Sequence, residues 1–174
     1  MDAEELFRRY KAGERNFAGV DLSGASLFGS SLDGINLSGA NLTQANLQDA
    51  FLPDANLDGA ILTAAKLSGA NLDCASLRGA NLDGADLVES NFSSANLNGA
   101  TLKGADFTMA LLNSASLEGA SLDGAILEET NLRDADLRNA SIEGIETETL
   151  LLCCENTVMP NGQVASNPWV AGNL

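Results

Sequence analysis

The feature that most constrains this chain is a large apolar side chain at every fifth residue from Phe17 to Ile142. The series runs through 26 consecutive positions and consists of 22 Leu, three Phe and the final Ile. Ala stands two residues earlier in 20 of the 26 units, and Asn, Asp or Ser usually fills the place between them. The unit is therefore A-[N/D/S]-L-x-x. Because one unit cannot bury its own apolar group, the units must stack to form a core.

A period of five excludes both a regular helix and a flat strand. Along an α-helix five residues advance about 500°, so the apolar residues would scatter around the cylinder. Along a flat strand an odd period would place successive ones on opposite faces. Short extended segments joined by tight bends keep all of them on one side. The second x is Gly in 14 of the 26 units, which suits bends that need unusual backbone angles.

The repeated A-[N/D/S]-L-x-x unit, in register over residues 16–145, resembles the pentapeptide repeat family. The resemblance implies an all-β fold, a right-handed quadrilateral β-helix with four pentapeptides per coil and about six and a half coils. Leu and Ala would fill its interior, and a coil spacing of ~4.8 Å would make a rod roughly 30 Å long. The segments from Leu6 to Phe17 and from Val158 to Gly162 resemble cyanobacterial members in particular.

The N-terminal residues predict a short helix over 2–12 that covers the open end of the first coil. Asp2 can cap this helix, with Glu5 three residues on in a capping-box pattern, and Gly13 ends it. Its apolar stripe, at the 3/4 spacing of a helix, consists of Ala3, Leu6, Phe7 and Tyr10. The expected parts of the chain are a helical cap at 1–15, the β-helix at 16–145, and a C-terminal cap and tail at 146–174.

The C-terminal part contains an apolar run, Thr149–Cys154. We expect this run to cover the last coil or, as the alternative, to contact a second subunit in a homodimer. Pro160-Asn161-Gly162 is typical of a turn, and we expect 163–174 to be loosely ordered.

The three cysteines are an odd number and do not indicate a disulfide framework. We expect Cys74, Cys153 and Cys154 to be reduced thiols. A disulfide to Cys74 would require the tail to fold back along the rod, and a bridge between the two adjacent cysteines would be strained.

The formal net charge is −15, and 17 acids against five bases place −12 of it within 16–145. Nucleic acid and anionic membranes would be repelled, so neither is an expected partner. There is no apolar stretch long enough to span a membrane. The N-terminus lacks the basic and apolar regions of a secretory signal, and we therefore expect a cytoplasmic location.

The residues for common catalytic chemistry are missing. The chain contains no His, which excludes His-based acid–base catalysis, a Ser-His-Asp triad and imidazole metal ligands. Adjacent cysteines lack the spacing of a zinc site, and the glycines form no nucleotide-binding motif. We expect no enzyme activity, no cofactor and no metal.

With four pentads per coil, the units centred on Leu27, Leu47, Leu67, Leu87, Phe107 and Leu127 share one face. Its outward positions have a net charge of −5, against −1, −3 and −3 on the other faces. Apolar residues among carboxylates indicate a protein-binding surface; the alternative is an ordinary solvated exterior on which Ile and Val favour extended backbone. The candidate residues on this face and the adjacent one are Phe28, Asp49, Phe51, Asp86, Val88, Glu89, Asp106, Met109, Leu111, Ile126, Glu128 and Glu129.

Three functions fit these features. The first is a non-catalytic scaffold that presents its acidic face to a protein partner. The second is a DNA mimic that binds a type II topoisomerase (gyrase), as quinolone-resistance members of the family do. Duplex DNA carries about 18 charges over this length. The net charge of −12 on residues 16–145 is therefore a lower charge density than that of DNA. The third is a structural or stress-related protein without a specific partner.

Overall fold

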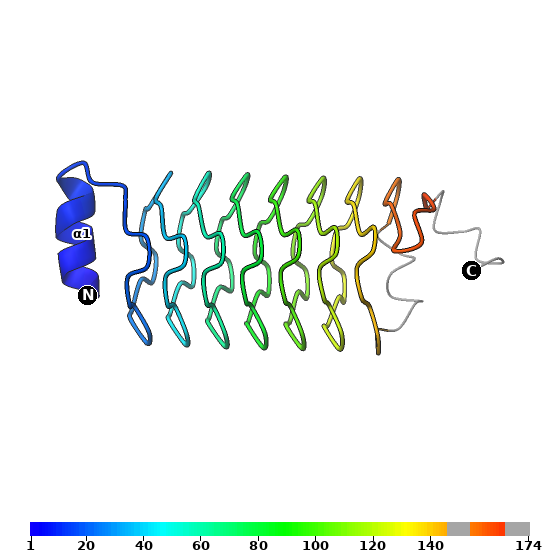
Figure 1. The fold of residues 1–174 in the computed structure, drawn as a ribbon, viewed down its shortest axis with the longest axis horizontal. Helices are drawn as coiled ribbons and strands as arrows, with labels where there is room; N and C mark the ends of the chain where they lie inside the picture. The colour runs from blue at the N-terminus through cyan, green and yellow to red at the C-terminus, as the bar shows by residue number, and fades with distance from the viewer. Residues whose placement is uncertain (146–153, 166–174) are drawn as a thin grey trace.

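The computed structural model describes residues 1–145 and 154–165. Helix α1 (Ala3–Lys11) lies at one end of a stack of coils that follow each other along the rod in chain order (Figure 1). Parallel bridges join residues 20 apart, from Asn16 with Asn36 to Ser121 with Ser141. One coil therefore takes four pentads, as the resemblance implies. The right-handed sense of the coil stays a prediction.

Each pentad turns a corner within itself. The carbonyl of the central residue accepts a hydrogen bond from the N–H three residues later, as in Ala40 N to Leu37 O at 3.0 Å. The second x has a positive φ in every unit from Gly19 to Gly144, which is the pattern of a type II turn. Four of the five residues belong to the turn, so a single residue is left to bridge neighbouring coils. This explains why the described sides of the coil consist of isolated bridges rather than longer strands.

The hydrogen bonds of the five backbone N–H groups in a pentad explain why the motif has Asn or Asp before the central residue. Backbone carbonyls accept four of them, one within the turn and three in neighbouring coils, as in Leu42 N to Ile61 O at 2.7 Å. The N–H of the first x is left over. The Asn or Asp side chain two residues earlier accepts it, as in Asp58 N to Asn56 Oδ1 at 3.0 Å. The Asn or Asp of the motif is therefore a turn-capping residue.

Stacked side chains fill the interior of the coil. Every central residue from Phe17 to Leu137 is at most 3% exposed, and every Ala that precedes one by two residues, from Ala40 to Ala140, is at most 7% exposed. The central residues also number the faces: face 1 runs from Phe17 to Leu137, face 2 from Leu22 to Ile142, face 3 from Leu27 to Leu127 and face 4 from Leu32 to Leu132.

Helix α1 packs across the first coil. Leu6 is fully buried, and Ala3, Phe7 and Tyr10 are partly buried against the core. The Asp2 side chain caps the helix by accepting from Glu5 N at 2.8 Å. The reciprocal half of the expected capping box is not formed, because the Glu5 carboxylate accepts from Arg8 Nε at 2.9 Å instead. An acid four or three residues from a base on one helix face pairs readily, and here this pairing prevails.

Residues 154–160 rejoin the ladder after a shift in register. Val158 bridges Asp136, 22 residues earlier, where the regular coil would need 20. Cys154 and Met159 occupy the buried places of central residues, at 3% and 8% exposed. Two extra residues have therefore entered the repeat before this point.

A hairpin follows and covers part of the last edge. Gly162 N donates to Met159 O at 2.8 Å, so the turn predicted at Pro160-Asn161-Gly162 is confirmed. Val164 then bridges Val158 in antiparallel sense, which blocks further pairing at this position. Residues 149–153 of the apolar run and 166–174 of the tail lie outside the described residues, so the cap and the homodimer both stay predictions.

Candidate functional site

The twelve candidate residues differ in exposure. Asp86, Val88 and Asp106 are half-buried. The exposed ones are Phe28, Asp49, Phe51, Glu89, Met109, Leu111, Ile126, Glu128 and Glu129. Among them, Phe28 is 60% exposed, and the other large apolar residues are between 42% and 48% exposed.

Six of the exposed candidates come together on three consecutive coils. Glu89 N donates to Thr108 O at 2.9 Å and Met109 N donates to Glu128 O at 2.8 Å, so Glu89, Met109 and Glu129 form one column at ~4.8 Å spacing. Leu111 follows Met109 round the corner onto face 4, and Ile126 lies beside the column on face 3. We call this set the acidic patch: Glu89, Met109, Leu111, Ile126, Glu128 and Glu129.

The remaining exposed candidates lie elsewhere. Phe51 and Leu111 share a column but are separated by three bridges, through Asn71 and Asn91, or ~14 Å. Phe28 belongs to the first coil, beside helix α1. The predicted binding face thus separates into the acidic patch and the exposed apolar residues Phe28 and Phe51 nearer the N-terminal end.

The candidate carboxylates have two different roles. Asp106 accepts from Thr108 N at 2.9 Å, and Asp86 accepts from Val88 N at 3.3 Å. Both are turn caps and serve the coil. The side-chain carboxylates of Glu89, Glu128 and Glu129 form no hydrogen bond or ion pair with any described residue. Asp49 is likewise exposed and without a side-chain partner, but it lies two coils before Glu89 in the same column and outside the acidic patch. Within the acidic patch, the three glutamates are available to a partner.

Several acids outside the candidate list are also structural. In some pentads where Ser or Thr precedes the central residue, an acid from the preceding coil caps the turn instead. Asp58 accepts from Arg78 N at 2.9 Å, and Asp123 accepts from Glu143 N at 3.1 Å. The hydroxyl of Ser141 also donates to Asp123, and these bonds lower the pKa of its carboxyl. A Ser 18 residues after an Asp is the sequence signal for this pairing.

The acidic patch departs from the residues that the coil itself favours. Leu111 and Ile126 stand where Asn or Asp would cap the turn, so the N–H groups of Asn113 and Glu128 have no acceptor among the described residues. The column residues have φ of 56°, 60° and 54° at Glu89, Met109 and Glu129. A left-handed conformation costs a non-glycine residue about 1–2 kcal/mol.

The described residues give little evidence for a metal site, a reactive cysteine or a membrane-spanning helix. No cluster of three or more Cys, Asp or Glu there could hold a metal ion. Cys74 is a free, exposed thiol whose pKa is raised by desolvation and by Asp73, while Cys154 is buried in the core. Cys153 lies outside the described residues. Helix α1 is too short to cross a membrane, and no other described helix could do so.

Comparisons with known proteins agree with the repeat. The model of the family described as "Pentapeptide repeats" matches eight copies, in residues 14–44, 40–73, 70–108 and 110–145. HetL, a protein involved in heterocyst differentiation regulation from the cyanobacterium Nostoc sp. strain PCC 7120, is 28% identical over 94% of this chain and 99% of its own, with a TM-score of 0.32. Rfr23 from the cyanobacterium Cyanothece 51142 is 27% identical over 80% and 98%, with a TM-score of 0.40.

A further solved structure, QnrB1, a plasmid-mediated fluoroquinolone resistance protein, is 20% identical over 77% of this chain and 78% of its own, with a TM-score of 0.37. None of the curated proteins matches the chain. The family match covers well over half of the residues and coincides with the ladder of 20-residue coils. The chain belongs to the pentapeptide repeat family.

Proposed function

We propose that this protein is a non-catalytic scaffold that binds a protein partner through the acidic patch. The observation that carries the proposal is the composition of this patch. Three glutamates without a partner surround three exposed apolar side chains, at positions where the coil would be better served by Gly, Asn or Asp. The fold does not require these residues, so a binding role gives a reason for them.

The chemistry of the patch describes its partner. Apolar side chains bordered by carboxylates fit a surface with an apolar centre and a Lys or Arg rim. The patch lies on a backbone that neighbouring coils hold by hydrogen bonds on both sides, as at Met109. Because this backbone is already ordered, binding loses little conformational entropy on the scaffold's side.

The test is affinity capture of partners at low and moderate salt with three baits. The first is the wild type, and the second carries Glu89→Lys, Glu128→Lys and Glu129→Lys. The third is a matched control with the same charge change at exposed glutamates away from the patch, Glu4→Lys, Glu118→Lys and Glu143→Lys. We expect a protein that the wild type and the control retain and the patch variant loses. Equal retention by the two variants would overturn the proposal.

The DNA-mimic function remains the second candidate, supported by the net charge of −12 on residues 16–145. Against it, acids such as Asp58, Asp106 and Asp123 point into hydrogen bonds of the coil, which thins the charge available to a DNA-binding enzyme. Inhibition of DNA gyrase supercoiling by the purified protein would favour the mimic. The absence of any specific partner in the capture would favour the structural role.

A further inference from the structure

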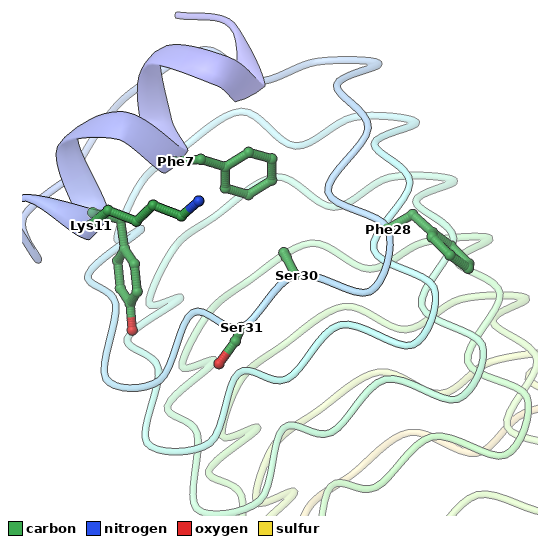
Figure 2. A pocket seen from close by; sticks show the side chains of 6 residues that line it. Phe7, Lys11, Phe28, Ser30 and Ser31 are labelled. Atoms are coloured by element: carbon green, nitrogen blue, oxygen red, sulfur yellow. The ribbon is translucent and has the colours of Figure 1, made fainter.

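A pocket separate from the acidic patch lies between helix α1 and the first coil (Figure 2). Its volume is about 330 Å³. The helix and the coil contribute equally to its lining, which consists of Phe7, Tyr10, Lys11, Phe28, Ser30 and Ser31. Figure 2 shows Phe7 and Lys11 on the helix facing Ser30 and Ser31 on the coil, with Phe28 at the far side.

The walls of this pocket are held in place. The N-terminal ammonium of Met1 donates to Asp21 O at 3.0 Å, and Tyr10 Oη donates to Asp33 O at 2.8 Å. The guanidinium of Arg15 lies 3.9 Å from the centre of the Tyr10 ring. Helix α1 is thus fixed to the first coil at both ends, and the space beneath it is preformed.

The charge around the pocket differs from that of the rest of the chain. Residues 1–15 contain four acids and four bases, so all of the −15 net charge arises from the 20 acids and five bases of 16–174. Within the balanced end, Arg8 pairs with Glu5 and Arg9 with Glu14. The side-chain ammonium of Lys11 forms no hydrogen bond or ion pair with any described residue. The pocket therefore has an uncompensated cation at its edge.

Ser30 supplies an independent observation. It occupies the position two residues before a central Leu, where most pentads have Ala. The hydroxyls at equivalent positions donate to backbone carbonyls, as Thr130 does to Phe107 O at 2.8 Å and Ser90 to Leu87 O. Ser30 Oγ is buried, yet it has no partner among the described residues. An unpaired buried hydroxyl is unfavourable, and rotation about χ1 can turn it toward a ligand.

We propose that this pocket binds a small monocarboxylate whose apolar body is about the size of one aromatic ring. The apolar body would lie against the Phe7 ring, with Phe28 at the far rim (Figure 2), and the carboxylate would accept from Lys11 Nζ and the Ser30 hydroxyl. The volume lies at the lower end of the ~300–1,000 Å³ of small-molecule pockets, which sets the size. This inference does not rest on the acidic patch.

The experiment is an NMR titration of the full chain with two probes of the same shape, phenylacetate and its neutral amide, phenylacetamide. Phenylacetate should cause saturable shifts of the backbone amides of Phe7, Lys11 and 28–31. Phenylacetamide should bind about threefold to tenfold more weakly, because it lacks the charge that pairs with Lys11.

Two pairs of variants locate the effect. Lys11→Gln should bring the two probes to equal affinity, whereas Lys66→Gln, which removes the same charge from the exposed surface of face 3, should leave their ratio unchanged. Ser30→Ala should weaken phenylacetate binding and leave the fold intact, since Ala is the usual residue there. No saturable shift at these amides, equal affinity of the two probes for the wild type, or equal effects of the two lysine variants would overturn the proposal.

Discussion

Face 1 and face 3 bury the same kind of central column, but their outer surfaces differ. On face 1 the corner glycines recur in every coil from Gly19 to Gly119, and the residue before the central one is Asn, Ser or Asp throughout. On face 3 the corners include Asp49, Glu89, Met109 and Glu129, all with positive φ. Face 1 thus has the residues that the turn favours, whereas face 3 retains larger side chains in spite of the turn.

The difference separates two demands on one repeat. The coil requires a buried Leu, a small residue two places before it, a turn-capping acceptor and a left-handed corner, and face 1 satisfies all four from the pentad of Leu57 onward. The acidic patch on faces 3 and 4 lacks the turn-capping acceptor at Leu111 and Ile126, and it has non-glycine residues at its left-handed corners. Because the coil still forms where a capping acceptor or a corner glycine is missing, the outer surface of a pentapeptide coil can vary while the interior remains constant.

The largest effect should come from the interior and should be the same on both faces. Leu97 on face 1 and Leu87 on face 3 are both fully buried. Leu97→Ala and Leu87→Ala should each lower the free energy of unfolding by about 2–5 kcal/mol. Urea denaturation measures both. A difference between them well above about 1 kcal/mol would mean that the interior, too, distinguishes the faces.

The corner glycines should show the next largest effect. Gly79 on face 1 has a φ of +62° and open space around an added Cβ, whereas a Cβ on Gly69 of face 3 would lie 2.5 Å from Asp49 Oδ1. Gly79→Ala should cost about 1–2 kcal/mol for the left-handed conformation alone. Gly69→Ala should cost only slightly more, because the exposed Asp49 carboxylate can turn away from the new Cβ, and Asp49→Ser combined with it should remove the excess. Thermal unfolding compares the three; equal losses for the two single variants would contradict the role of Asp49.

A substitution in the acidic patch should change the free energy of unfolding by a smaller amount, and it should stabilise the fold. Leu111→Asn supplies an acceptor for the Asn113 N–H and should raise the free energy of unfolding by about 0.5–1 kcal/mol, while it weakens partner binding. The reverse change, Asn91→Leu, is the matched control. Asn91 lies directly beside Leu111 and accepts from Ser93 N at 3.0 Å, so its loss should destabilise by a similar amount. A destabilising Leu111→Asn would show that Leu111 serves the fold.

The smallest effect concerns acid. The bonds from Ser141, Glu143 and Ser121 lower the pKa of Asp123 below its ordinary value of 3.8. A lowered pKa contributes stability that is present above the unfolded-state value and is lost as the pH falls through the folded-state value. Asp123→Asn should therefore lower the Tm slightly at about pH 7, and the difference should shrink as the pH falls below the ordinary value of 3.8. Asn98 makes the equivalent bond, to Glu118 N at 2.9 Å, so a large loss at the higher pH would contradict this account.

The period of five predicted the buried column from Phe17 to Leu137 and the bends at glycine, while the four pentads per coil were implied by the resemblance to the family. The column and the bends follow from local sequence, because every unit repeats the same burial and the same turn. The roles of the carboxylates could not be read in this way. Whether Asp58 caps a turn depends on the short Ser76 beside it in the next coil, with its hydroxyl 2.6 Å from Asp58 Oδ1. Such a partner becomes visible only once the coil length is known.

The pocket, the register shift and the unpaired glutamates could not be predicted from the sequence either. The pocket needs Phe7 and Phe28 to lie across the junction of helix α1 and the first coil, and no local pattern predicts that junction. The register shift before Cys154 depends on residues that interrupt the repeat. The unpaired side chains of Glu89, Glu128 and Glu129 are likewise a property of their surroundings. The position of these glutamates beside Met109, Leu111 and Ile126 on three consecutive coils is what reduced the twelve candidates to the acidic patch.

The most direct test of the binding patch is site-specific photo-crosslinking with a matched pair of positions. Leu111 on face 4 and Ile61 on face 2 are 42% and 44% exposed and stand at the same place in their pentads. A photoreactive phenylalanine derivative would replace one or the other, and the full chain would be irradiated in a lysate of its source organism. The account predicts a discrete crosslinked protein from position 111 and none from position 61. The same product from both positions, or a product from position 61 alone, would contradict it.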